Sequence, residues 1–264
     1  MTIQRNLYLL LALLCFVIPD SAAAQYYVRP AASVNCPTEP CLSLGEYVSS
    51  VSDYFTSNTS FIFLEGDHHL KVSVALRDIT NMTLSGRNTG SRIIVSEAGI
   101  SWIGSASIVL NWLRFEYYGT HVPGPLLLFN SSASVITNVQ FSRFSNMPLN
   151  FSAISYIQSE GLIARSSFSY GQSLNGSAIY MDSSTVSFSD VTFRNNTASL
   201  YGGAIYANRS FRFTHVASWF FVMLWDTLAI FVRPVGRGIM THSFVTYWAK
   251  KKMLFFVTCS FLDL

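Results

Sequence analysis

The clearest pattern in the chain is a short phrase of apolar and polar positions that recurs at a nearly fixed spacing. The phrase appears as Leu110–Phe115, Ile136–Phe141, Ile163–Phe168 and Phe188–Phe193, and its closing phenylalanines are 26, 27 and 25 positions apart. Its first, fourth and sixth residues are mostly apolar, and a two-residue polar break fits two short strands that meet at a bend. A period in the twenties without a helical pattern predicts a stacked β-solenoid.

A second unit repeats with the same spacing. Gly176-Ser-Ala-Ile-Tyr180 is followed 26 residues later by Gly202-Gly-Ala-Ile-Tyr206. Small residues allow a tight corner or a close backbone approach, and Ala-Ile-Tyr resumes a strand. No helical pattern follows the glycines, so a phosphate-binding loop is not favoured. The complete motif of this repeat consists of Phe193, Asn196, Gly202, Gly203, Ala204 and Ile205.

The fold expected from these repeats is an all-β parallel β-helix of about five to seven rungs over residues 61–216. Its closing phenylalanines should stack inside the coil, where each aromatic pair adds about 0.5–1.5 kcal/mol beyond burial. Ser166, at the fourth position of its phrase, is the weakest match to the pattern. Residues 25–60 should form an N-terminal cap, in which Leu42–Phe55 carries an amphipathic helical stripe.

The N-terminus has the features of a secretory signal peptide over residues 1–24. Arg5 supplies the positive region, Leu7–Ile18 is apolar, and Ala22–Ala24 offers a cleavage site. The apolar region is too short for a membrane span, and the cleavage site argues against an N-terminal anchor. The mature chain would then begin near Gln25.

Two further features agree with secretion. Cys36 and Cys41 flank a short Pro-rich loop suited to a local disulfide, because a metal site would need two more ligands nearby; Cys259 is left without a partner. N-glycosylation sequons, which read as surface positions, occur at Asn58, Asn81, Asn130, Asn150, Asn175, Asn195 and Asn208. Asn195 also belongs to the repeat, which leaves open that it is buried or hydrogen-bonded instead.

The combination of Phe193-x-x-Asn196 with Gly202-Gly-Ala-Ile205 resembles the repeat of polymorphic outer-membrane-protein-like right-handed β-helix proteins. The front of the chain is similar to the N-terminal region of large secreted β-helix proteins of marine invertebrates, in Tyr26–Val28, Cys36–Pro37, Cys41–Leu44, Phe63–His68 and Met82–Gly86. The resemblance covers roughly residues 25–216. It implies a surface or adhesive module and no particular reaction.

The period ends after Val216, and residues 217–264 form an apolar tail without repeats, irregular or helical. One interpretation is a membrane anchor over Val216–Val232, followed by Arg233 and Arg237 as cytoplasmic residues. Asp226 within it would cost about 2.5–3.5 kcal/mol on the insertion scale. The alternative is a repeat array cut short, or a misread gene segment, which would leave an uncapped rung.

Composition and charge add few candidates for chemistry. Half of the 264 residues are hydrophobic, 12% are charged and the formal charge is +3, with no basic face for nucleic acid. Polysaccharide lyases and hydrolases among β-helices use several carboxylates on one face, and a glycosidase needs a pair. Here Asp182, Asp190 and Glu160 are scattered, and Asp190 falls in the polar break, where an exposed bend is expected. His68 and His69 would point to opposite faces of a strand and are interpreted as turn residues, so neither a metal nor a cofactor is expected.

The function predicted is a secreted or cell-surface, non-enzymatic β-helix module that binds an extracellular protein or glycan, since solenoid faces are extended and rigid. A carbohydrate-active β-helix enzyme is the first alternative, and clustered carboxylates on one face would favour it. A face of Ser, Thr, Asn and exposed aromatic residues would favour binding. A truncated, non-functional paralogue is the second alternative. The tail also leaves open a single-pass membrane protein with an extracellular N-terminal region.

Overall fold

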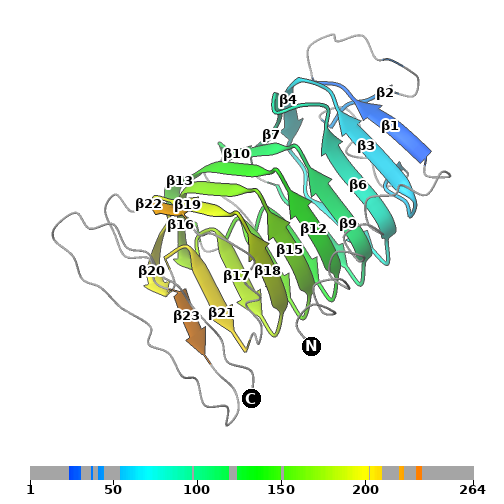
Figure 1. The fold of residues 1–264 in the computed structure, drawn as a ribbon. Helices are drawn as coiled ribbons and strands as arrows, with labels where there is room; N and C mark the ends of the chain where they lie inside the picture. Colours follow the sequence, from blue (N-terminus) through cyan, green and yellow to red (C-terminus); the bar gives the residue numbers. More distant parts are fainter. Residues whose placement is uncertain are drawn as a thin grey trace.

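The computed structural model is a parallel β-solenoid of about five turns, which confirms the fold class and the predicted number of rungs (Figure 1). It describes residues 24–30, 37, 41–44, 54–96, 98–118, 124–149, 152–201, 203–209, 220–222 and 230–233. The strands form three long sheets, and every strand pairs in parallel with the equivalent strand of the next rung.

Each sheet takes one strand from each rung along most of its length. Sheet A contains β1 (Ala24–Val28), β2 (Cys41–Leu42), β3 (Thr59–Phe63), β6 (Thr80–Gly86), β9 (Ala106–Asn111), β12 (Ala133–Thr137), β15 (Glu160–Ala164) and β18 (Thr185–Ser189). Sheet B contains β4 (Gly66–Leu70), β7 (Ser91–Val95), β10 (Arg114–Tyr117), β13 (Gln140–Leu149), β16 (Ser167–Asn175), β19 (Thr192–Arg194) and β22 (Phe220–Val222), with β20 (Thr197–Tyr201) beside β16. Sheet C contains β5 (Val74–Arg77), β8 (Ile100–Ile103), β11 (Leu127–Asn130), β14 (Ile154–Ile157), β17 (Ile179–Asp182), β21 (Ile205–Asn208) and β23 (Ile230–Arg233).

The repeated phrase crosses the corner between sheets A and B. In the phrase that ends at Phe141, β12 stops at Thr137, β13 starts at Gln140, and Asn138 between them has φ 55°. The equivalent residues of the other phrases also have a left-handed backbone, namely Trp112 (φ 54°), Arg165 (46°) and Asp190 (53°). The predicted bend, with Asp190 exposed at it, is therefore confirmed.

The closing phenylalanines form the predicted column inside the coil. Successive ring centroids of Phe115, Phe141, Phe168 and Phe193 are 5.1, 4.7 and 5.3 Å apart, and the rings are nearly parallel. A second internal column on sheet C stacks Trp102, Phe129 and Tyr156 at 4.9 and 5.0 Å. Both columns are almost wholly buried, so the core contains two aromatic stacks, packed together with buried aliphatic side chains.

Buried serines complete the corners. Ser166, the weakest match to the pattern, is 3% exposed; its hydroxyl donates to the Ala164 carbonyl (2.7 Å) and accepts from the Val139 N–H (3.2 Å). An equivalent serine ladder, which the sequence analysis does not predict, lies at the corner between sheets C and A. There each serine hydroxyl accepts the backbone N–H of the preceding rung, through Ser105, Ser132, Ser159 and Ser184.

The front of the chain departs from the expectation in two places. Gly66, Asp67 and both histidines lie in strand β4, so the turn assigned to them is wrong and only Glu65 bends. The expected opposite orientation of the histidines is confirmed, since His68 is 1% exposed and its neighbour is half-buried on the outer face. Leu42 lies in strand β2 rather than at the start of a helix. Near the end of the expected cap helix Tyr54 is helical, and residues 45–53 lie outside the described residues.

Two short pieces of the C-terminal tail are described, and both are strands. β22 pairs with β19, and β23 pairs with β21, each in the register of its sheet. Among the described residues no helix is long and apolar enough to cross a membrane. The remainder of the proposed anchor segment, and the signal peptide up to residue 23, lie outside the described part of the chain.

Candidate functional site on the outer faces

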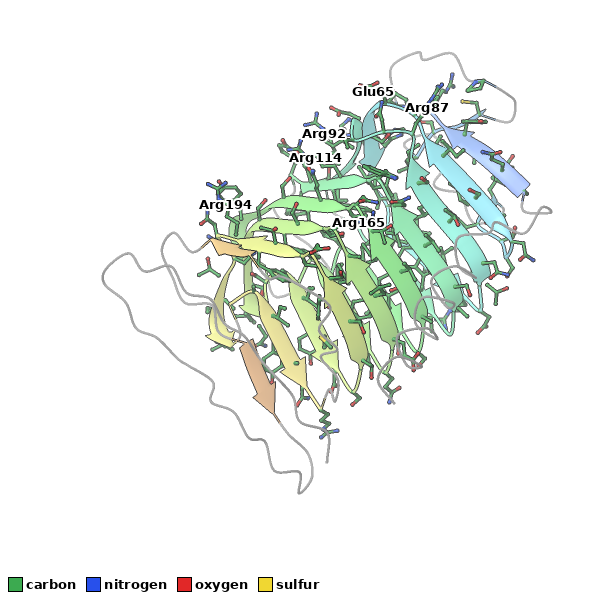
Figure 2. All side chains as sticks on the ribbon, in the orientation of Figure 1. Glu65, Arg87, Arg92, Arg114, Arg165 and Arg194 are labelled. Atoms are coloured by element: carbon green, nitrogen blue, oxygen red, sulfur yellow. The ribbon has the colours of Figure 1, made fainter. Side chains whose placement is uncertain are left out.

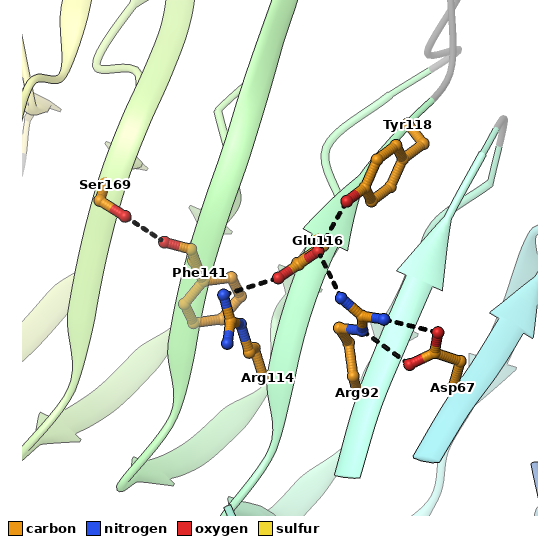
Figure 3. A network of polar contacts seen from close by, with 7 residues as sticks. All are labelled: Asp67, Arg92, Arg114, Glu116, Tyr118, Phe141 and Ser169. Atoms are coloured by element: carbon orange, nitrogen blue, oxygen red, sulfur yellow. Dashed lines mark hydrogen bonds and ion pairs between the residues drawn. The ribbon is translucent and has the colours of Figure 1, made fainter. Parts of the chain in front are cut away.

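The outer face of sheet B carries a charged network in the N-terminal half of the solenoid (Figures 2 and 3). We define this network as Asp67, Arg92, Arg114, Glu116 and Tyr118. Arg92 pairs with Asp67 (Nε–Oδ1 2.7 Å) and with Glu116 (Nη1–Oε2 3.2 Å), so one guanidinium joins strands β4, β7 and β10. Arg114 holds the other oxygen of Glu116 at 2.8 Å, and the Tyr118 hydroxyl donates to Oε2 at 3.0 Å.

The electrostatics of this network are those of charge pairing. The hydrogen bond and charge of Arg92 hold the pKa of Asp67 below its usual value, and the same contact raises the pKa of Arg92. Glu116 is 1% exposed and contacts two guanidinium groups. A general acid would need a pKa near the working pH, whereas the contact with Arg92 lowers the pKa of Asp67. The arrangement therefore favours cross-linking of three rungs over proton transfer.

The acidic residues singled out in the sequence do not come together. Asp182 lies on the outer face of sheet C, Asp190 at the corner between sheets A and B, and Glu160 at the start of β15 in sheet A. The pair that does share a face, Asp67 and Glu116, was missed. It could have been found by aligning the rungs, because Asp67 and Arg114 both align with Arg92, and Glu116 lies two residues after Arg114.

The outer face of sheet C carries a pair of stacked tyrosines from the Gly-x-Ala-Ile-Tyr units. Tyr180 and Tyr206 occupy the same position in neighbouring rungs, with ring centroids 5.5 Å apart and an angle of 25° between the rings. Both are half-buried, and partial burial, Asp182 and Tyr206 raise the pKa of Tyr180, so its phenol stays neutral. We call these two residues the tyrosine pair.

Polar groups lie next to the tyrosine pair. Two positions further along the same strands, the Asn208 side chain donates from Nδ2 to Asp182 Oδ1 at 3.1 Å. Aromatic faces beside amide and carboxylate groups can pack on the C–H face of a sugar or on an apolar side chain while bonding its polar groups. This is the kind of face that the sequence analysis associates with binding.

The motif residues themselves act within the fold. The Asn196 amide donates to the Phe168 carbonyl (2.9 Å) and accepts from the Gly171 N–H (3.0 Å), both in the preceding rung. Gly176 has φ 51°, and a Cβ there would overlap the Ile179 carbonyl and the Tyr206 backbone nitrogen, which supports the expected close backbone approach. Ala204 and Ile205 are buried, and Gly202 lies outside the described residues.

The sequons occupy different environments. Asn58 and Asn81 are exposed in neighbouring rungs, and Nδ2 of Asn81 donates to Oδ1 of Asn58 at 2.9 Å. Half-buried sequon asparagines are Asn130, Asn175, Asn195 and Asn208, whereas Asn150 lies outside the described residues. Glycosylation at any of them stays a prediction.

The cysteines and candidate metal ligands add no site. Cys41 lies in β2, but Cys36 lies outside the described residues, so their pairing stays a prediction. Within the described ranges no group of three or more His, Cys, Asp or Glu residues could hold a metal ion.

Comparison with known proteins gives one short match. The model of the Chlamydia polymorphic membrane protein repeat matches residues 190–208, the stretch that contains Phe193, Asn196 and the second Gly-x-Ala-Ile-Tyr unit. No curated protein and no solved structure matches the chain. The fold defines a parallel β-helix protein, and with this repeat it suggests a surface, adhesin-like β-helix protein.

Proposed function

We propose that the chain is a secreted or cell-surface, non-enzymatic module that binds glycans or proteins through its outer faces. The observation that carries this proposal is the tyrosine pair, in which two rungs present the same aromatic ring at the same position. A predicted signal peptide, a Cys36–Cys41 disulfide and glycosylated sequons are part of the same proposal and agree with an extracellular role.

The physical basis is a rigid and periodic surface. Each outward position recurs with the spacing between hydrogen-bonded strands, about 4.8 Å, so a partner meets the same kind of group at regular intervals. The backbone is held by its neighbours on both sides, so little conformational entropy is lost when a partner docks. Such a surface favours weak contacts that add up over several rungs.

The test is binding by a full-length, tagged chain purified from a secretory cell. The double variant Y180S/Y206S should bind glycan arrays and cell surfaces at least about tenfold more weakly than the wild type, because both aromatic faces are lost. The matched control S167A/T192A changes two outward positions of sheet B and should bind normally. Equal binding by the wild type and Y180S/Y206S would contradict the proposal.

A carbohydrate-active enzyme is the alternative function, and it would need carboxylates that share a face. Asp67 and Glu116 share the outer face of sheet B, but Arg92 pairs with both of them and Arg114 pairs with Glu116 as well. This charge pairing supports a binding module. Release of reducing or unsaturated sugars from polysaccharides by the wild type, abolished in Glu116→Gln, would favour the enzyme instead.

A further inference from the structure

Trp112 is an exposed aromatic residue in a strained backbone conformation. It has φ 54°, and 42% of the residue is exposed at the corner between sheets A and B. A left-handed conformation suits glycine, asparagine and aspartate, whereas it is a genuine outlier for a bulky side chain. The equivalent corner position holds Asn138, Arg165 and Asp190 in other rungs, and Trp112 has the largest side chain of the four.

The corner is built to hold Trp112 in this conformation. Gly86 lies beside it in the preceding rung, and a Cβ on Gly86 would overlap the Trp112 carbonyl oxygen. The Trp112 N–H in turn donates to the Thr137 carbonyl of the following rung at 3.3 Å. Backbone strain of this kind persists only where the surroundings fix it, and it gathers at functional sites.

The side chains that bond to one another beside Trp112 are uncharged, and Arg165 stands at the same corner one rung beyond Asn138. Asn111, which precedes Trp112, accepts from the Asn138 amide and the Thr137 hydroxyl through its Oδ1 atom, both at 3.0 Å. Both bonds use the same oxygen, so the Asn111 Nδ2 hydrogens and the Asn138 Oδ1 atom are available to a ligand. An indole face beside amide donors and acceptors matches a neutral pyranose ring, which has a face of C–H groups and a rim of hydroxyls.

We propose that Trp112, with Asn111 and Asn138, forms a binding site for neutral oligosaccharides of pyranose units at the corner between sheets A and B. This site lies on a different part of the rung from the tyrosine pair, and it rests on the proposed binding function by naming its ligand class. The strained tryptophan is retained because its exposed ring contacts the sugar.

The experiment titrates the purified full-length chain with cellohexaose and with chitohexaose, followed by tryptophan fluorescence and calorimetry. The variant W112N should lose at least about tenfold in affinity, because the stacking face is removed. It should also raise the Tm by about 2–4 °C, since asparagine tolerates the left-handed backbone. If W112N does not fold, W112G also removes the stacking face and tolerates the left-handed backbone. W112F keeps an aromatic ring and should keep part of the affinity.

The matched control is Y170N, because Tyr170 is also an exposed aromatic residue with a left-handed backbone (φ 59°). Y170N should raise the Tm without weakening sugar binding. No binding of either hexasaccharide by the wild type, or unchanged affinity in W112N and W112G, would overturn this site. If Y180S/Y206S loses cell-surface binding while W112N does not lose sugar affinity, the proposed function stands and the Trp112 site fails.

Discussion

At the scale of the single residue, the side chains that decide the fold bond to the backbone of a neighbouring rung. Asn196 fills two hydrogen-bonding positions on the preceding rung, so its amide ties two rungs together. His68 also bonds to the backbone, because its Nε2 donates to the Leu64 carbonyl at 2.8 Å inside the first rungs. A residue that the sequence leaves as a turn histidine is thereby part of the core.

His68 makes stability depend on pH. Burial lowers its pKa below the usual 6.5, so between the folded and unfolded values the unfolded chain binds more protons and stability falls as the pH falls. Thermal melts from about pH 8 to about pH 5 should show a decline that begins near the unfolded pKa of about 6.5. Asp67 contributes only at lower pH, because its lowered pKa lies below that of a free carboxyl.

The matched pair H68N and H69N separates this effect from a general acid response. H68N should flatten the decline between about pH 6.5 and about pH 5, since asparagine does not titrate. H69N changes the outward neighbour and should leave the slope as it is. A slope that survives in H68N would assign the pH dependence to another group.

At the scale of the element, the corner ladders are as regular as the strands. Successive serines at the corner between sheets C and A each cap the N–H of the preceding rung while their own hydroxyl donates to a carbonyl. Hydroxyls are needed here because a buried N–H without a partner costs about 1–3 kcal/mol. The ladder therefore lets the chain turn sharply without leaving polar backbone groups unpaired.

Ser159→Ala should destabilise the fold by about 1–3 kcal/mol, because it removes the acceptor of the buried Ser132 N–H. Ser167→Ala, at an outward position of β16, should change the free energy of unfolding by less than about 0.5 kcal/mol. Urea denaturation followed by circular dichroism would measure both. Equal losses in the two variants would mean that the ladder adds nothing specific.

The sequence predicts features that depend on repeated large apolar residues, and it misses features that depend on polar contacts between rungs. The phenylalanine column was predictable because burial of a large apolar group repeats visibly with the rungs. The serine ladder repeats with the same spacing, but serine in a Ser-rich chain is indistinguishable from a surface residue until its partner is known. The charged network was missed for a related reason, since Asp67, Arg92 and Arg114 stand at matched positions but differ in type, and Glu116 lies two residues further along its strand.

At the scale of the whole molecule, each rung contacts its neighbours and little else, so stability is close to a sum of rungs and interfaces. The tyrosine pair and the Trp112 corner then lie on separate parts of one rigid rod, and we expect the binding proposed at each to change without disturbing the other. The match of the repeat to residues 190–208 concerns one such unit. The similarity of the front of the chain to invertebrate β-helix proteins stays a prediction.

Phe141→Ala should lower the free energy of unfolding by about 3–5 kcal/mol. The Phe141 ring stacks on a phenylalanine on each side, so its removal leaves a cavity in the middle of the column. Phe141→Leu keeps most of the volume and should cost less. Amide hydrogen exchange should show the loss of protection strongest in β10, β13 and β16 and weaker toward both ends. Uniform loss over all described strands would indicate a single cooperative unit instead.

The parallel stacking of nearly identical rungs also determines how the molecule responds to force. A pull on the last rung loads the hydrogen bonds of one interface at a time, so rungs should peel off one after another. Each step would release about 26 residues, or about 90 Å of extended chain. A chain that lengthens in such steps dissipates the mechanical work as each rung unfolds, while its remaining rungs stay folded.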